Sequence, residues 1–155
     1  MINVKPLCQR DARWADAKLG HSDLTIGNYG CTITSLTMLY NLVTSRNLNP
    51  FDVNERLKAN GGFVGAKLLW SGINRALPEL KFTWRGYNYQ NLRVAQYVYF
   101  KNLAVMVQVN PGKALAVLEH WCLYLGYQRM ADPWDGKIKS TATYPATGYT
   151  LIDRK

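Results

Sequence analysis

Apolar residues recur at helical spacing directly after a glycine-containing loop near residue 30. The positions that share one predicted face are Ile33, Leu36, Leu39, Tyr40 and Val43. Steps of three and four residues are the period of an α-helix with one buried side, so a helix is predicted over residues 31–46. Cys31 therefore falls in the first turn of this helix, and the loop with Gly27 and Gly30 leads into it.

Helical patterns continue through the first two thirds of the chain. Asn49-Pro50 is a helix start, because asparagine caps a first turn and proline fits the first helical position. Gly61-Gly62 then ends that helix. The other elements predicted in this part are a loop over residues 16–28, a strand over 81–87, and helices over 66–77 and 91–100.

The last third of the chain has short apolar runs instead. The predicted strands cover residues 103–109, 120–127, 130–132 and 148–153. A tight turn near Gln128-Arg129 would join the second and third of these strands into a hairpin. Helices followed by antiparallel strands indicate an α+β fold, with N-terminal helices packed on a C-terminal sheet in one domain of residues 1–155.

Cysteine usage and hydropathy indicate where such a chain is made. Three cysteines without a CxxC motif argue against a disulfide framework and fit synthesis in a reducing cytosol. Residues 1–10 lack the apolar core of a signal peptide, and no apolar run approaches membrane-spanning length. We therefore expect cytoplasmic synthesis without a signal peptide and no membrane partner.

The net charge of +9 bears on the choice of partners. Lysine and arginine are scattered along the chain, so their field would attract any anionic polymer without distinguishing nucleic acid, acidic lipid or cell wall. A solvated basic surface explains the charge equally well. Because the aromatic residues form no stacking platform, specific nucleic-acid binding is the least favoured of the functions considered.

Cys31 is a candidate nucleophile because of the place that the predicted helix gives it. Unpaired backbone N–H groups and the positive end of the helix dipole stabilise a thiolate in a first turn. The thiolate is the nucleophilic form of cysteine, and Gly30 would let a substrate backbone approach it closely. The alternative is that Cys31 is a small buried apolar side chain.

His120 is the candidate base, since it opens a predicted strand that is otherwise apolar. An imidazole beside the Cys31 thiol takes its proton and later protonates the leaving amine. Asp132, on the next strand of the hairpin, would reach the imidazole and fix its tautomer. Asp135 competes for this orienting role, and an Asp-Pro turn explains Asp132 without any catalysis.

Four short segments follow one another in a specific order. They are PLCQRDARWA with Gln9, TIGNYGCTITSLTML with Cys31, HWCLYLGY with His120 and ADPWDG with Asp132. This set, which spans residues 4–136, resembles the papain-like cysteine peptidases, and among them the bacteriocin-leader (double-glycine) peptidase-like group with its stand-alone members. The resemblance implies a papain-like fold with Cys31 as nucleophile, His120 as base and Asp132 as orienting group. It also implies that the Gln9 side chain and the Cys31 backbone N–H donate to the oxyanion.

The same resemblance implies hydrolysis of a peptide bond through a thioester, without metal or cofactor. Stand-alone relatives occur in bacteria and their phages, so the expected function is that of an endolysin-like phage enzyme that cuts peptidoglycan peptides, released by lysis or carried on a virion. The sequence differs from the exporter-linked relatives in the long separation of Gln9 from Cys31, and Thr32 stands where many relatives have glycine. The alternatives are a leader-peptide-processing peptidase and a non-catalytic binding protein on the same fold.

The remaining cysteines and histidine have simpler explanations. Cys122 lies on the same side of its predicted strand as His120 by the two-residue alternation of strands. A zinc site of Cys31, His120 and Cys122 would lack a fourth ligand, so no metal is expected. The other local expectations are a packed Cys8, a solvated His21, and Trp121 and Trp134 placed to shield the imidazole from water.

Overall fold

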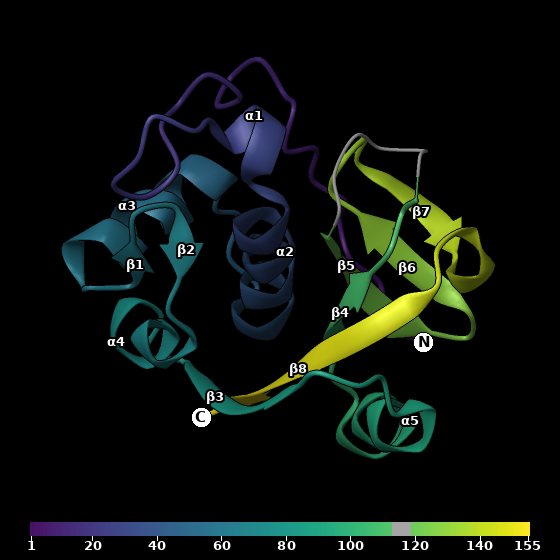
Figure 1. Cartoon of the computed structure of the whole chain (residues 1–155). Helices are drawn as coiled ribbons and strands as arrows, with labels where there is room; N and C mark the ends of the chain where they lie inside the picture. Colours follow the sequence, from purple (N-terminus) through teal and green to yellow (C-terminus); the bar gives the residue numbers. More distant parts are fainter. Residues whose placement is uncertain (113–118) are drawn as a thin grey trace.

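The computed structural model describes residues 1–112 and 119–155. The helices are α1 (Ile26–Tyr29), α2 (Cys31–Thr44), α3 (Pro50–Ala59), α4 (Ile73–Ala76) and α5 (Asn91–Lys101), with 3₁₀ turns η1 (Trp70–Gly72) and η2 (Thr141–Thr143). The strands are β1 (Phe63–Val64), β2 (Lys67–Leu68), β3 (Leu80–Gly86), β4 (Val105–Val109), β5 (His120–Gly126), β6 (Arg129–Asp132), β7 (Lys137–Ser140) and β8 (Ala146–Arg154). Helices dominate the N-terminal part and strands the C-terminal part (Figure 1), which confirms the predicted α+β class.

The main sheet is antiparallel and has six strands in the order β3-β8-β4-β5-β6-β7. α2 packs against β5, and α5 contacts β4, β5 and β8 (Figure 1). Every residue of β4 and β5 is buried, which explains why these strands read as continuous apolar runs rather than as an alternation. The strands predicted over 103–109, 120–127, 130–132 and 148–153 are confirmed, with ends shifted by a few residues.

α2 is the central helix of the fold. The five residues predicted to share its buried face are all buried, and Thr34, Ser35, Thr37 and Met38 are buried as well. The helix is covered on more than one side because it packs against β5 and against α3. It ends at Thr44, where Ser45 takes a left-handed conformation with φ 57°. The predicted helix is thus confirmed, and it packs against both the sheet and α3.

The start of α3 is confirmed in detail. The Asn49 side chain accepts a hydrogen bond from the Asp52 backbone N–H at 3.0 Å, and the Asp52 carboxylate accepts from the Asn49 N–H at 3.0 Å. This reciprocal capping box satisfies two N–H groups that a helix end leaves unpaired. The helix ends at Ala59, just before the predicted glycine stop at Gly61.

The helix predicted over residues 66–77 is wrong in its first half. β1 and β2 form a hairpin there, with Phe63 opposite Leu68. Gly65 takes the left-handed conformation, with φ 59°, that the turn of this hairpin requires. In the second half of the predicted range, the chain is helical in η1 and α4.

Two further elements were not predicted. The loop predicted over residues 16–28 contains the short helix α1, whose N-cap Thr25 accepts from the Asn28 N–H. β7 is an edge strand with mostly exposed residues, so its sequence has little apolar signal, and its pairing with β6 defines it. Within the described residues, no helix combines the length and the apolar character needed to cross a membrane.

Candidate active site

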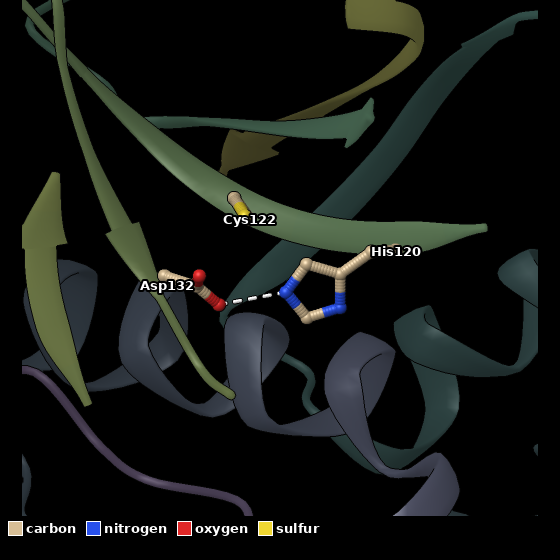
Figure 2. Close-up of side chains that lie close together, drawn as sticks. All are labelled: His120, Cys122 and Asp132. Carbon is tan, nitrogen blue, oxygen red and sulfur yellow. Dashed lines mark hydrogen bonds and ion pairs between the residues drawn. The ribbon is translucent and has the colours of Figure 1, made fainter. Parts of the chain in front are cut away.

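Asp132 and His120 meet across the hairpin of β5 and β6. In these antiparallel strands, Leu123 lies opposite Ala131. The same register places Asp132 opposite Cys122, which is two residues from His120. Diagonal neighbours on one face of a sheet lie within reach of long side chains. Figure 2 shows the imidazole and the carboxylate pointing toward each other, with Nε2 and Oδ1 2.7 Å apart. The prediction that Asp132 reaches His120 is confirmed.

The register depends on the turn between the two strands. Tyr127 and Gln128 both take left-handed conformations, with φ 51° and 56°. Two successive residues of this kind make a tight hairpin turn whose twist matches that of the strands. A register slip of one residue would turn Asp132 to the opposite face of the sheet, so this turn is what aligns the carboxylate with the imidazole.

The Asp132 carboxylate is fully buried and accepts four hydrogen bonds. Oδ1 accepts from His120 Nε2 and from the Trp134 backbone N–H at 2.8 Å; Oδ2 accepts from Lys139 Nζ at 2.6 Å and from the Tyr144 hydroxyl at 3.1 Å. Burial by itself would raise the pKa of Asp132, but the hydrogen bonds from His120 and Lys139 hold it well below its usual range. The carboxylate is therefore ionised at neutral pH.

Asp135 does not take part in this pair. Its Oδ2 lies 3.0 Å from Lys139 Nζ, and its Oδ1 accepts from the Lys137 backbone N–H at 3.3 Å. Lys139 thus bridges the two acids, and only Asp132 contacts His120. Of the two residues considered for the orienting role, the structure brings Asp132 to the imidazole.

The His120 imidazole is only 1% exposed. Burial opposes its protonation, but the hydrogen bond with Asp132 and the nearby thiols of Cys122 and Cys31 raise its pKa above the ordinary value. The rings of Trp134 and Tyr144 meet the imidazole edge-on, with centroids 6.4 and 6.1 Å away. Trp134 thus shields the ring as predicted. Because Asp132 engages Nε2, Nδ1 is the nitrogen left to exchange a proton with a thiol.

Cys31 is the first residue of α2 and is partly exposed. α1 ends and α2 begins at Gly30, where a Cβ atom would lie 2.5 Å from the Ile26 carbonyl oxygen. Only glycine lets the two helices follow each other so closely. One turn further along α2, Ser35 Oγ donates to the Trp121 carbonyl at 3.1 Å, next to His120. This bond joins the helix of the thiol to the strand of the imidazole.

Gln9 is buried next to both parts of the site. Its backbone N–H donates to the Pro133 carbonyl at 2.7 Å, and its Nε2 donates to the Gly27 carbonyl at 3.0 Å. Although Gln9 is far from Cys31 in the sequence, its side chain thus bonds to α1, the short helix that directly precedes Cys31. A continuous helix would offer the Gly27 carbonyl to the Cys31 N–H, whereas here it accepts from Gln9. Gln9 Oε1 is buried without a hydrogen-bond partner among the described residues.

Comparisons of the chain with protein-family models, with curated proteins and with solved structures find no match. The function of the site therefore rests on its geometry and on the sequence resemblance. Of the four residues that the resemblance implies, His120 and Asp132 are in contact, Cys31 lies near His120, and Gln9 is bonded to Pro133, which follows Asp132, and to Gly27 in α1.

Cys122 adds a third possible metal ligand beside the pair. The ligand atoms of His120, Cys122 and Asp132 all lie within 4.8 Å of one another. The Asp132 oxygen atoms, however, are already engaged, and the Lys139 ammonium lies 2.6 Å from one of them. All four hydrogen bonds to the Asp132 carboxylate come from protein groups. The donors present therefore do not fit a resident metal ion.

A cavity of about 450 Å³ opens beside the site. Thr32, the residue after Cys31, lines it, as do Glu119 and Trp121 on either side of His120. Trp121 packs against Trp70 with ring centroids 5.2 Å apart, so one wall of the cavity is aromatic. This volume suits part of a peptide substrate.

Several residues of the site were missed by sequence reasoning. Lys139 and Tyr144, which hold Asp132, belong to an edge strand and to the segment after it. The only signal was a lysine in an alternating polar segment, which is typical of any exposed edge. Cys8 is half-buried and its thiol donates to the Trp134 carbonyl at 3.4 Å, while His21 is exposed, as expected.

Proposed function

We propose that this protein is a papain-like cysteine hydrolase that cleaves an amide bond of a peptide. The observation that carries the proposal is the buried His120–Asp132 pair, set beside Cys31 at the start of α2. A histidine oriented by an ionised carboxylate and close to a thiol is the arrangement that nucleophilic catalysis by cysteine requires.

Each side chain then has one role. His120 Nδ1 takes the proton of the Cys31 thiol, and Sγ attacks the carbonyl carbon of the scissile amide. The Cys31 N–H and the second N–H of Gln9 Nε2 donate to the oxygen that becomes negative. Asp132 stays ionised and holds the Nε2–H of the imidazolium.

The intermediate collapses when the C–N bond breaks and the imidazolium gives its proton to the departing amine. The acyl group remains on Cys31 as a thioester. A water molecule then attacks the thioester carbon while His120 takes a proton from it. The C–S bond breaks, the acid leaves, and His120 returns the proton to Sγ, which restores the free thiol. The four donors around Asp132 keep the carboxylate in place through both steps.

The proposed substrate is a peptide of the bacterial cell wall, cut by an enzyme of the phage endolysin type. The net charge of +9 supports it, because an anionic wall polymer attracts such a protein at long range. This attraction needs no specific contact, and its only effect is to raise the concentration of the protein near the wall.

The test is the release of amino groups from purified cell walls of several bacteria. The wild type should release them and Cys31→Ala should not, whereas Cys8→Ala, a change of another partly buried cysteine, should behave as the wild type. Release that persists in Cys31→Ala would overturn the proposed chemistry. Cleavage of a double-glycine leader peptide without action on walls would make the protein a leader-processing peptidase, and cleavage of neither would favour a binding protein.

A further inference from the structure

Arg85 of β3 lies partly buried in the wall of the cavity beside Cys31. Its guanidinium carbon is 4.5 Å from the ring centroid of Tyr87 and 4.7 Å from that of Trp121. Two aromatic rings thus hold the guanidinium in one orientation. Trp121 directly follows His120 on β5, so the ring that the guanidinium contacts is one residue along the chain from the candidate catalytic pair.

The hydrogen-bond partners of Arg85 are neutral. Nη1 donates to the carbonyl oxygens of Gly86 and Tyr149, and Nη2 donates to Gln108 Oε1. Among the described residues, no carboxylate lies within ion-pair distance of this guanidinium. Glu119, an exposed residue of the same cavity, acts on it only at longer range.

This environment is unusual for a charged side chain. Burial lowers the pKa of Arg85 because the cation has lost part of its water without gaining an anion in contact. Arg13 and Arg46, by contrast, form ion pairs with Asp11 and Glu79. Arg85 is held by rings and neutral oxygens instead, and among the described residues no carboxylate contacts it.

The donors that remain on Arg85 define what it would bind. A guanidinium has five N–H donors, and those of Nε and the second hydrogen of Nη2 form one side of the group. The three hydrogen bonds above start from Nη1 and Nη2, and Nε has no partner among the described residues, so two of the five donors remain. A carboxylate accepts such a pair with both oxygens, which favours a planar anion over a point charge.

We propose that Arg85 makes this cavity a binding site for a peptide carboxylate. This inference rests on the proposed function: the enzyme selects peptides that have a free carboxylate near the bond that it cuts. The cavity connects Arg85 with Thr32, the residue after Cys31, so the carboxylate and the scissile bond belong to one extended peptide. Trp70 and Trp121 supply an apolar wall for the rest of that peptide.

The binding test uses Cys31→Ala, which cannot turn over a substrate. The probes are two sets of tetra-alanine peptides with both termini blocked. In one set a glutamate replaces each alanine in turn, and in the matched set a glutamine does. Tryptophan fluorescence reports binding, because Trp70 and Trp121 line the cavity. At one position or more, the glutamate peptide should bind roughly 10-fold to 100-fold more tightly than its glutamine match. Equal affinities at every position would overturn the proposal.

Two variants in the same background assign the difference to Arg85. Arg85→Met keeps an apolar stem and should remove the preference for glutamate, while Arg85→Lys keeps the charge and should retain only part of it. Arg93→Met is the control, since Arg93 stacks on Trp84 outside this cavity and its loss changes the net charge equally. A preference that survives Arg85→Met in a folded protein, or that Arg93→Met removes as well, would contradict the assignment.

Turnover by the wild-type protein separates this inference from the proposed function. If Arg85-dependent binding is found and no peptide is cleaved, the carboxylate site stands and the hydrolase does not. If peptides are cleaved with equal efficiency whether they carry glutamate or glutamine, the hydrolase stands and the carboxylate site is overturned.

Discussion

Ser35 Oγ donates a hydrogen bond of 3.1 Å to the carbonyl oxygen of Trp121, and both groups are buried. Ser35 lies one turn after Cys31 on α2, and Trp121 directly follows His120 on β5. This is a polar link between the element that carries the thiol and the element that carries the imidazole. Apolar contacts have no preferred direction and would allow α2 to shift along β5, whereas a directional hydrogen bond favours one position of the helix on the strand.

We expect Ser35→Ala to lower the free energy of unfolding by about 1 kcal/mol, the usual cost of one such bond. It should also slow alkylation of Cys31 by iodoacetamide, since the first turn of α2 is then held less firmly against β5. Thr37→Val is the matched control, because the Thr37 hydroxyl bonds to the Ile33 carbonyl at 2.7 Å within the same helix. Equal slowing of alkylation in both variants would contradict the role of the Ser35 bond.

Cys31 should be the reactive thiol of the native protein. It begins a helix beside His120 and is partly exposed, whereas Cys122 is fully buried with the pKa of its thiol raised by burial to about 11. Limiting iodoacetamide near pH 7, followed by mass mapping of the adduct, should place the label on Cys31 ahead of Cys8 and Cys122. Preferential labelling of Cys8 would count against the site.

Acid should destabilise the protein through Asp132. Its folded pKa is depressed, so its contribution to stability is present above the unfolded value of about 4 and is lost as the pH falls further. The unfolding free energy of the wild type should therefore fall between about pH 5 and pH 2 more steeply than that of Asp132→Asn. The raised pKa of His120 has the opposite sign, since its contribution is present below about pH 6.5 and declines as the pH rises.

Asp135→Asn is the control for this acid dependence, because Asp135 shares Lys139 with Asp132 but does not contact His120. At pH 7, Asp132→Asn should cost roughly 3–5 kcal/mol of unfolding free energy, as expected when one partner of a buried ion pair is removed. Asp135→Asn should cost less than about 1 kcal/mol, since its pair is partly exposed. Denaturant titrations across the pH range measure both, and the reverse ranking would show that the orienting group is misassigned.

Lys139 should act as a positioning residue for Asp132. Lys139→Met removes the cation at 2.6 Å from Oδ2, so the pKa of Asp132 should rise toward its ordinary value. The pH at which the protein loses stability in acid should move upward, and the unfolding free energy at pH 7 should fall by roughly 2–3 kcal/mol. Lys137→Met removes an equal charge from an exposed position of the same strand and should change neither quantity beyond about 0.5 kcal/mol. An unchanged acid transition in Lys139→Met would contradict the assigned role.

The sequence by itself determined the elements whose signals are local. The apolar face of α2, the cap of α3 and the runs of β4, β5 and β8 all follow from spacing and from residue chemistry between near neighbours. Cys31 at a helix start and Asp132 within reach of His120 also follow, because a short hairpin keeps the two strands together. The hairpin of β1 and β2 was missed because each of its strands has only two residues, too few to show an alternating pattern.

Only the tertiary structure decided which groups surround the pair. Lys139 reaches Asp132 because β7 adds to the far side of β6, and Tyr144 reaches it from the segment that follows. Arg85 meets Trp121 although β8 and β4 separate their strands in the sheet. Such contacts depend on strand order and on the path of the chain between elements, and neither leaves a periodic pattern in the residues themselves. The charge state and the orientation of the site are therefore properties of the folded sheet.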